Sequence, residues 1–266
     1  MQGTRLDSEL VRRGLARSRG HASTLIAEHR VTVSGRLASK PATVVQPDSP
    51  VTVASADDPE WASRGAHKLI GALDAFTVSV SGRRALDAGA STGGFTDVLL
   101  RRGAAEVVAV DIGEGQLVPR LRDDPRVRVV DRTNVRALTV DQVGGPADVV
   151  VADLSFISLG LVLPALLSCA SPRADVLPMV KPQFEVGRGR LGSGGVVRDA
   201  QLRVRAVLGV AGNARQQGWG VVAVTASPLP GPSGNVEYFL HLRTDVVDNV
   251  AATEELVRAA VREGPQ

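Results

Sequence analysis

The sequence predicts an α/β protein in which helices cover both faces of an open, mainly parallel sheet, with a small α+β module in front. Three observations predict this fold. Apolar strand-like segments alternate with helical segments from residue 84 onward, and a glycine-rich turn separates the first such strand from its helix. The first 50 residues also differ from the rest in charge. Strand-helix alternation is typical of parallel sheets with crossover helices on both faces.

The amino-terminal module is predicted from its short elements and its charge. Two helical runs, at 6–15 and 22–26, precede short strand-like segments at 31–33, 42–45 and 51–53. Residues 1–50 hold eight basic and four acidic side chains, whereas the remaining 216 residues hold 23 basic and 24 acidic ones. A basic module on a neutral body indicates that the smaller unit binds an anionic partner, although a merely solvated basic face is the alternative.

A linker is predicted between the two parts. Residues 54–60 are small and acidic and have no apolar periodicity. We therefore expect a module at 1–55, a linker at 56–63 and a body at 64–266. In the body, Leu69, Ala72, Leu73 and Phe76 recur at helical spacing, with Lys68 at the edge of that stripe.

The remaining elements of the body follow from apolar runs and their breaks. Strands are expected at 84–88, 106–112, 127–130, 148–152, 174–180, 221–225 and 236–242. Helices are expected at 94–102, from 159, and at 200–217. Pro178 conflicts with a buried strand, because proline cannot donate a hydrogen bond to its neighbour. We keep the strand prediction there.

Composition excludes several classes of protein. Cys169 is the single cysteine, which excludes an internal disulfide framework, and the four histidines lack metal-like spacing, so no metal site is expected. Charged residues near the start argue against a signal peptide, so we expect a cytoplasmic protein. The uncharged stretch 154–172 approaches the ~20 residues of a membrane span. Because it contains Gly160 and Pro164, we interpret it as a strand end running into a core helix.

The glycine-rich turn at 87–95 predicts a nucleoside site. Asp111 follows 22 residues after Gly89, at the end of the next strand, where a carboxylate can accept hydrogen bonds from ribose hydroxyls. The turn departs from the dinucleotide pattern G-x-G-x-x-G, and Asp87 could meet the amino group of a methionine moiety. This favours S-adenosylmethionine over NAD. A purely structural turn is the alternative.

Charged residues at other strand ends are catalytic candidates. Asp153 and Lys181 each follow an apolar strand, at the edge where ligands of open α/β sheets bind. Glu237 interrupts an apolar run, so we expect it to face a partner, and Lys68 is the fourth candidate. Each of these residues alone would most often be a surface charge.

Five stretches resemble the TlyA family of RNA 2′-O-methyltransferases, also called hemolysins: SRGAHKL, LDAGASTGGFTDVLL, VADLSFISL, VKPQFEVG and SPLPGPSGNVEYFL. The body of that family is an FtsJ-like, Rossmann-like class I methyltransferase. The amino-terminal module resembles the small RNA-binding domain first described in ribosomal protein S-four. The resemblance implies that the family's Lys-Asp-Lys-Glu tetrad falls on Lys68, Asp153, Lys181 and Glu237.

The resemblance also implies a reaction. It is methylation of the ribose 2′-hydroxyl of cytidine in ribosomal RNA, in the small subunit, the large subunit or both, with S-adenosylmethionine as cofactor. In actinobacterial members this modification creates sensitivity to capreomycin-type antibiotics. The expected partner is ribosomal RNA within ribosomal subunits. We expect a monomer without stable membrane association.

Site residues follow from the same resemblance. The residues expected to contact the cofactor are Asp87, Gly89, Ala90, Ser91, Thr92, Gly93, Gly94, Phe95, Asp111, Ile112, Asn134, Asp153, Leu154 and Phe156. The residues expected to contact RNA are Arg5, Arg17, Arg19 and Lys40 in the module, and Arg132 and Arg136 in the body. The linker departs from the family, because Pro59-Glu60-Trp61-Ala62 stands where mycobacterial members have Arg-x-Trp-Val. This leaves the coupling between the two domains open.

Chemistry assigns a role to each member of the tetrad. A 2′-hydroxyl is a poor nucleophile near neutral pH, so it must be aligned with the sulfonium methyl and lose its proton. We expect Lys181 to take that proton, because burial beside Lys68 and the sulfonium favours a neutral amine. Asp153 and Glu237 would orient the lysines. Which lysine loses its proton is open at this point.

Three other functions are compatible with parts of the sequence. A membrane-lytic protein would need a lipid-facing segment, and 154–172 is the candidate. A nicotinamide dehydrogenase would use the glycine-rich turn but not the basic module. A non-catalytic RNA-binding factor would keep the basic module without needing all four tetrad residues.

Overall fold

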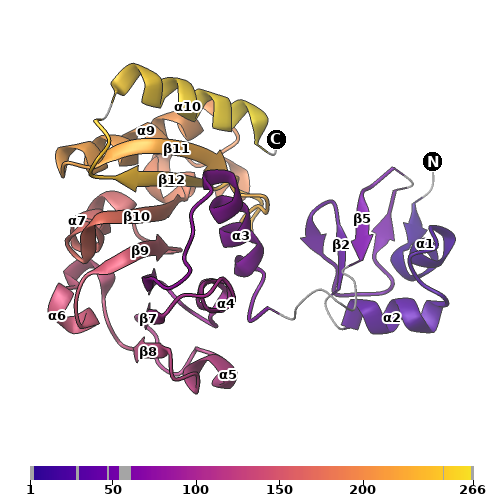
Figure 1. The fold of residues 1–266 in the computed structure, drawn as a ribbon. Helices are drawn as coiled ribbons and strands as arrows, with labels where there is room; N and C mark the ends of the chain where they lie inside the picture. The colour runs from indigo at the N-terminus through magenta and orange to yellow at the C-terminus, as the bar shows by residue number, and fades with distance from the viewer. Residues whose placement is uncertain (1–2, 28–29, 47, 54–60, 248, 265–266) are drawn as a thin grey trace. The chain divides into compact units, whose positions relative to one another are not determined.

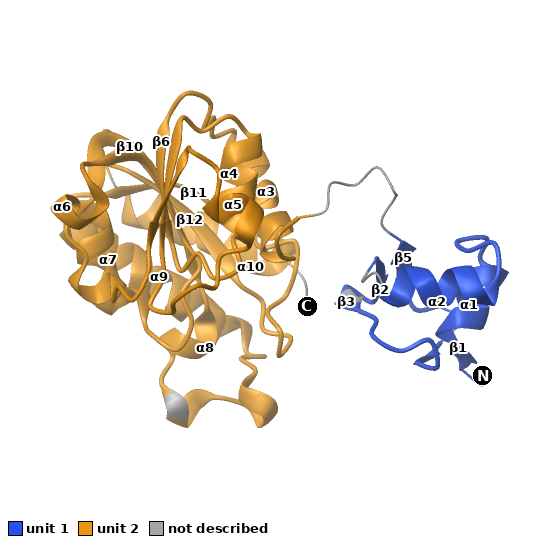
Figure 2. Cartoon of the chain, turned by 90° about the horizontal axis from the view of Figure 1, so that it is seen from below, with its two compact units in different colours: residues 1–60 blue, residues 61–266 orange. Residues whose placement is uncertain are grey.

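The computed structural model describes residues 3–27, 30–46, 48–53, 61–247 and 249–264. The chain divides into two compact units, residues 1–60 and 61–266 (Figure 2). Residues 56–60 of the expected linker, including Pro59, lie outside the described residues, so this part of the linker stays a prediction. Residues 61–63, which we assigned to the linker, belong to the larger unit.

The smaller unit has its own α+β architecture. Its elements are β1 (Thr4–Arg5), α1 (Leu6–Arg12), α2 (Arg19–Ala27), β2 (Val31–Val33), β3 (Arg36–Leu37), β4 (Val44–Val45) and β5 (Val51–Val53). Strand β2 lies between β3 and β5, and β1 pairs with β4, all antiparallel. Leu6, Leu10 and Ile26 are almost completely buried in a core of this unit alone. Apolar side chains of the two short helices therefore pack with those of the strands in one core.

The larger unit is built on a seven-stranded sheet in the order β11-β12-β10-β9-β6-β7-β8. The strands are β6 (Arg84–Ala88), β7 (Glu106–Val110), β8 (Val127–Val130), β9 (Ala147–Ala152), β10 (Ala170–Val180), β11 (Gly220–Ala226) and β12 (Tyr238–Arg243). Strand β12 is antiparallel to both of its neighbours, and the pairs among β10, β9, β6, β7 and β8 are parallel. The predicted α/β class is confirmed.

Helices cover both faces of this sheet (Figure 1). One face packs α3 (Gly65–Phe76), α4 (Gly94–Arg101) and α5 (Pro119–Arg122), and the other packs α6 (Val140–Val143), α7 (Leu159–Ser168), α9 (Ala200–Gln216) and α10 (Val250–Glu263). A short helix, α8 (Pro182–Glu185), follows β10, and 3₁₀ turns lie at Val135–Ala137, Arg188–Arg190 and Ser193–Gly195. Along β10, Val176 and Val180 enter one core whereas Leu177 and Met179 enter the other. This alternation explains the continuous apolar run of a strand buried on both sides.

Pro178 lies inside β10, as the strand prediction required. It pairs with Ala152 of β9. The registered pairs with β12 join Val176 to Leu242 and Met179 to Phe239, and they skip the two residues between. The missing proline N–H is therefore tolerated at a gap in that ladder.

The uncharged stretch 154–172 contains the loop after β9, helix α7 and the start of β10. Val162, Leu163 and Leu166 of α7 are fully buried in the core. Among the described residues, no helix combines the length and the apolar character that crossing a membrane requires.

Candidate active site

The glycine-rich turn joins β6 to α4 and is held by close backbone approaches. Gly89 and Gly93 have φ values of 89° and 103°. A Cβ on Gly89 would lie 2.5 Å from the carbonyl oxygen of Asp153, and one on Gly93 would lie 2.4 Å from Leu121 Cδ1. Side chains at these positions would displace the neighbouring strand end and α5, which explains why glycine is required.

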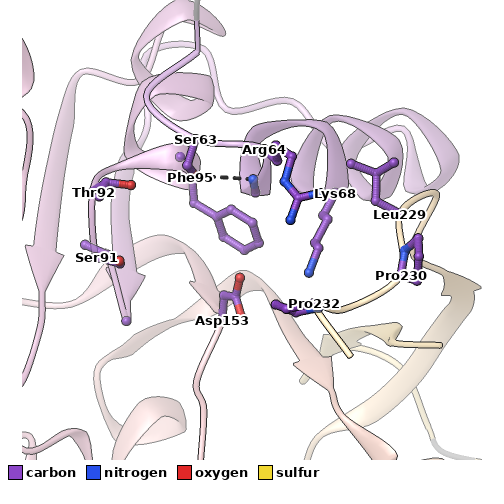
Figure 3. Close-up of a pocket in the computed structure, with 14 residues that line it drawn as sticks. Ser63, Arg64, Lys68, Ser91, Thr92, Phe95, Asp153, Leu229, Pro230 and Pro232 are labelled. Atoms are coloured by element: carbon purple, nitrogen blue, oxygen red, sulfur yellow. Dashed lines mark hydrogen bonds between the residues drawn. The ribbon is translucent and has the colours of Figure 1, made fainter. Parts of the chain in front are cut away.

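A cavity of about 240 Å³ opens above this turn, and we call it the loop cavity (Figure 3). Figure 3 shows Arg64 and Lys68 pointing into it from α3 and its N-terminus, opposite Asp153. Seven of the residues expected to contact the cofactor line it, namely Gly89, Ala90, Ser91, Thr92, Gly94, Phe95 and Asp153. Sequence reasoning missed Ser63, Arg64, Gly65, Leu229, Pro230 and Pro232, which also line it. The sequence could have indicated them, because they belong to SRGAHKL and SPLPGPSGNVEYFL, two of the stretches that resemble the family.

Asp111 organises the glycine-rich turn from the end of β7. Its Oδ2 accepts a hydrogen bond from the backbone N–H of Ser91 at 2.8 Å, and its Oδ1 accepts one from Gly113 N–H at 2.7 Å. The carboxylate therefore fixes the turn, and its remaining lone pairs are available to a ligand hydroxyl.

The loop cavity is not lined by four other residues expected to contact the cofactor, namely Ile112, Asn134, Leu154 and Phe156. Ile112 is 70% exposed beside Asp111. Asn134 accepts a hydrogen bond from Arg136 N–H and begins a 3₁₀ turn. Leu154 packs against the core. Phe156 lines a different cavity, described below.

Asp87 lies beneath the turn, inside β6, and is fully buried. Its Oδ2 accepts a hydrogen bond from Thr96 Oγ1 at 2.7 Å, and its Oδ1 has no partner among the described residues. Burial above all, with the nearby carboxylates of Asp153 and Asp111, raises the pKa of Asp87 to about 7, against the lowering effect of the hydrogen bond from Thr96. Three carboxylates at neighbouring strand ends form a negatively charged environment that favours a cationic ligand group. The described residues contain no cluster suited to a metal ion.

The four predicted catalytic residues meet as two ion pairs. Lys68 Nζ of α3 lies 2.5 Å from Glu237 Oε2, and Lys181 Nζ at the end of β10 lies 2.6 Å from Asp153 Oδ1. Lys181 Nζ also donates to Ser155 Oγ at 3.0 Å. Glu237 immediately precedes β12, is 1% exposed, and has its pKa raised by burial, against the lowering effect of Lys68. We expected Glu237 to face a partner, and in this geometry the side chain of Lys68 is that partner.

A second cavity, of about 590 Å³, adjoins the tetrad and shares Pro232 with the loop cavity, and we call it the wide cavity. Lys181 and Glu237 line the wide cavity, whereas Lys68 and Asp153 line the loop cavity. Phe156, 92% exposed, stacks obliquely on Phe184 in the wide cavity, with ring centroids 5.4 Å apart. The tetrad thus stands between two cavities, where groups from two ligands can meet.

The RNA-contact candidates of the smaller unit differ in their partners. Arg5 and Arg19 both bond to Asp7, at 3.0 and 2.9 Å, and these hydrogen bonds hold the pKa of Asp7 well below its usual range. The side chains of Arg5 and Arg19 are still about half exposed or more, at 49% and 62%. Arg17 and Lys40 are exposed as well. All four cations are therefore accessible to phosphates.

The two candidates on the body lie near the cofactor residues. Arg132 is exposed, has a φ of 53° and forms an ion pair with Glu114. Arg136 is exposed and continues the 3₁₀ turn that begins at Asn134. Both therefore lie on the segment that follows β8.

The first two residues of the larger unit, Trp61 and Ala62, contact α4. The backbone N–H of Ala62 donates to Asp97 Oδ2 at 2.9 Å, and the guanidinium of Arg101 lies 4.3 Å above the ring of Trp61. Asp97 also accepts hydrogen bonds from Arg101 and Arg120. Residues 61 and 62 thus contact the helix that the glycine-rich turn opens.

Comparisons with known families agree with both units. The model of FtsJ-like methyltransferases matches residues 61–244, and the S4 domain model matches residues 4–51. These matches correspond to the two compact units of the structure.

Individual relatives match over almost the whole chain. A protein of Mycobacterium tuberculosis named 16S/23S rRNA (cytidine-2′-O)-methyltransferase TlyA is 60% identical, covering 98% of each chain. Hemolysin A of Brachyspira hyodysenteriae is 35% identical, covering 89% of this chain and 98% of its own. A solved structure from Streptococcus thermophilus, named as a candidate hemolysin, aligns with a TM-score of 0.74 and 36% identity, covering 99% and 97% of the two chains. The chain therefore belongs to the FtsJ-like methyltransferases, in the TlyA family that joins this domain to an S4 domain.

Proposed function

We propose that this protein transfers a methyl group from S-adenosylmethionine to the ribose 2′-hydroxyl of a cytidine in ribosomal RNA. The observation that carries the proposal is the position of the Lys68-Asp153-Lys181-Glu237 tetrad between two cavities. Methyl transfer requires a donor and an acceptor to be aligned at one point, which two adjoining cavities permit. The 60% identity to an enzyme named for this reaction supports the same assignment.

The loop cavity has the features that S-adenosylmethionine requires. Gly89, Ala90 and Ser91 of the turn line it, and Asp111, which holds the Ser91 N–H, has lone pairs left to accept hydrogen bonds from ribose hydroxyls. Asp87, buried beneath the turn, has an unpartnered Oδ1 whose charge would favour a cationic group nearby. When bound, this cofactor supplies an electrophilic methyl group. Asp153 lines the cavity and adds negative charge that favours a positively charged sulfur.

Lys181 is the residue proposed to remove the proton of the 2′-hydroxyl. It lines the wide cavity, where a nucleoside would enter, and is 7% exposed. Asp153, its ion-pair partner, also lines the loop cavity, so a cation there shares this carboxylate with the lysine. Lys181 is therefore one ion pair away from the cavity proposed for the methyl donor, which suits removal of the hydroxyl proton at the point of transfer. Lys68 is neutralised by Glu237 at 2.5 Å, which favours a positioning role for that pair.

The smaller unit is proposed to hold ribosomal RNA through Arg5, Arg17, Arg19 and Lys40. Its exposed cations suit phosphates, which position a protein on RNA without selecting a base. The proposal includes action in the cytoplasm, on ribosomal subunits, by a monomer.

Transfer of tritium from labelled S-adenosylmethionine to purified small and large ribosomal subunits tests the proposal. We expect label in at least one subunit with the wild-type chain and none above background with Lys181→Ala. Mapping of 2′-O-methyl sites then identifies the nucleotide. Absence of transfer by the wild-type chain, with tight subunit binding, would favour a non-catalytic RNA-binding factor.

A membrane-lytic activity is the second candidate, because two of the relatives carry hemolysin names. Dye release from liposomes by purified protein tests it directly. We expect no release at protein concentrations that saturate methylation.

A further inference from the structure

Asn235 connects two loops that form one wall of the wide cavity. It is 2% exposed and lies two residues before Glu237. Its Oδ1 accepts a hydrogen bond from Val197 N–H at 2.9 Å, and its Nδ2 donates to the carbonyl oxygen of Gly195 at 3.0 Å. One amide side chain thus satisfies a backbone donor and a backbone acceptor of a segment about 40 residues away in sequence.

Both loops depend on tight turns rather than on regular structure. Gly194 and Gly195 have φ values of 74° and 73°, and Gly195 N–H donates to Gly192 O at 3.0 Å. On the other loop, Gly231 N–H donates to the carbonyl oxygen of Asn235 at 2.9 Å. Because glycine-rich segments have many accessible conformations, a specific hydrogen-bonded anchor is needed to hold them in one.

The wall that Asn235 joins is next to the tetrad. Gly194, Gly195 and Asn235 line the wide cavity together with Lys181 and Glu237. A Cβ on Gly231 would lie 2.6 Å from Glu237 Oε1, so the turn closed by the Asn235 carbonyl packs directly on the tetrad carboxylate. A change in this turn would therefore alter both the cavity wall and the surroundings of Glu237.

We propose that Asn235 is a positioning residue that holds the 192–197 loop in place and so keeps the wide cavity shaped for the target nucleoside. This inference rests on the proposed function, because it takes the wide cavity as the site of the methyl acceptor. If the wall is correctly formed in only a fraction of molecules, the apparent kcat/KM is the intrinsic value multiplied by that fraction. Cofactor binding is expected to be unaffected, because Asn235 does not line the loop cavity.

The test compares Asn235→Ala and Asn235→Asp with the wild-type full-length chain. We expect Asn235→Ala to lower kcat/KM for ribosomal subunits by about tenfold or more, while affinity for S-adenosylmethionine changes by less than about twofold. Backbone hydrogen exchange in residues 192–197 should become faster, and the strands should keep their protection. Asn235→Asp retains the acceptor for Val197 N–H but lacks the donor to Gly195, so we expect an intermediate exchange rate.

Asn249→Ala is the matched control. Asn249 begins α10 and its Oδ1 accepts a hydrogen bond from Ala252 N–H at 3.2 Å, away from both cavities. The control loses an asparagine amide and some stability but should keep wild-type kcat/KM. The inference is overturned if Asn235→Ala shows unchanged exchange in 192–197, or faster exchange with wild-type kcat/KM, or a loss of cofactor affinity equal to the loss of kcat/KM. Failure of the wild-type chain to methylate either subunit would instead contradict the proposed function.

Discussion

The two cavities on either side of the tetrad are built in different ways. The loop cavity also draws on several parts of the chain, at 63–68, 89–95, 153 and 229–232, but a single turn, 89–95, supplies six of its fourteen lining residues. The wide cavity is formed by segments from four separate parts of the chain, at 155–158, 181–187, 191–195 and 232–237. The turn 89–95 is fixed in part by local conformational rules. No segment supplies more than four of the fifteen residues that line the wide cavity, so its shape depends on contacts between loops. The difference predicts that cofactor binding and acceptor binding can be damaged separately.

Lys181→Ala should produce the largest effect, by lowering methylation while leaving cofactor binding nearly unchanged. The variant removes the proposed base, so kcat for subunit methylation should fall by about 10²- to 10⁴-fold. Affinity for S-adenosylmethionine should stay within a few fold, because Lys181 lines the wide cavity and not the loop cavity. Single-turnover methylation and calorimetry measure the two quantities. Near-normal turnover would exclude Lys181 from the mechanism.

Asp111→Ala should have the opposite effect, weakening cofactor binding more than it lowers methylation at saturating cofactor. Loss of the carboxylate leaves the N–H groups of Ser91 and Gly113 without these acceptors and removes the proposed partner of the ribose. We expect cofactor binding to weaken by about 1 to 3 kcal/mol. Methylation at saturating cofactor should change much less. Unchanged cofactor affinity by calorimetry would indicate that the nucleoside binds elsewhere.

Asp87 should make the stability of the cofactor-free protein depend on pH. Its folded-state pKa of about 7 lies above the ordinary value of 3.8, so the folded protein binds this proton more tightly than the unfolded chain does. The contribution of Asp87 to the free energy of unfolding therefore falls as pH rises from about 4 to about 7 and is constant above that range. Asp87→Asn removes this slope.

Denaturant unfolding at pH 5 and pH 8 checks this prediction. The free energy of unfolding of Asp87→Asn, taken relative to wild type at the same pH, should be higher at pH 8 than at pH 5 by about 2 to 3 kcal/mol. The same variant should bind S-adenosylmethionine more weakly. A difference between variant and wild type that does not change with pH would contradict a raised pKa at Asp87.

Single cations of the smaller unit should have the smallest effects. Arg17→Ala and Lys40→Ala should each weaken subunit binding and reduce the slope of log affinity against log salt by roughly one unit. Neither variant should change cofactor affinity, because both residues lie in the unit that lacks the loop cavity. Binding measured from low to physiological salt checks this. An unchanged salt slope would remove the residue from the RNA contact.

The sequence was most informative where structure is local. The alternation of strands and helices, the turn at 87–95 and the four tetrad residues could all be recognised from short patterns. Helix α10 was not among the predicted elements, although Val257, Ala260 and Val261 recur on one buried face. The role of Phe156 was assigned to the cofactor, whereas the structure turns it toward the wide cavity. The bonds of Asn235 to Gly195 and Val197 could not be anticipated, because no local pattern pairs those residues.

The attachment of residue 62 to Asp97 also bears on how freely the linker can vary. The bond comes from the main-chain N–H of Ala62, and every residue except proline provides that donor. Alanine at position 62 therefore keeps the attachment as any other non-proline residue would, and the ring of Trp61 beside it lies under the guanidinium of Arg101. A junction held through a backbone N–H tolerates different side chains at position 62 beside the ring of Trp61. Only a proline at position 62 would remove the donor and release the junction from α4.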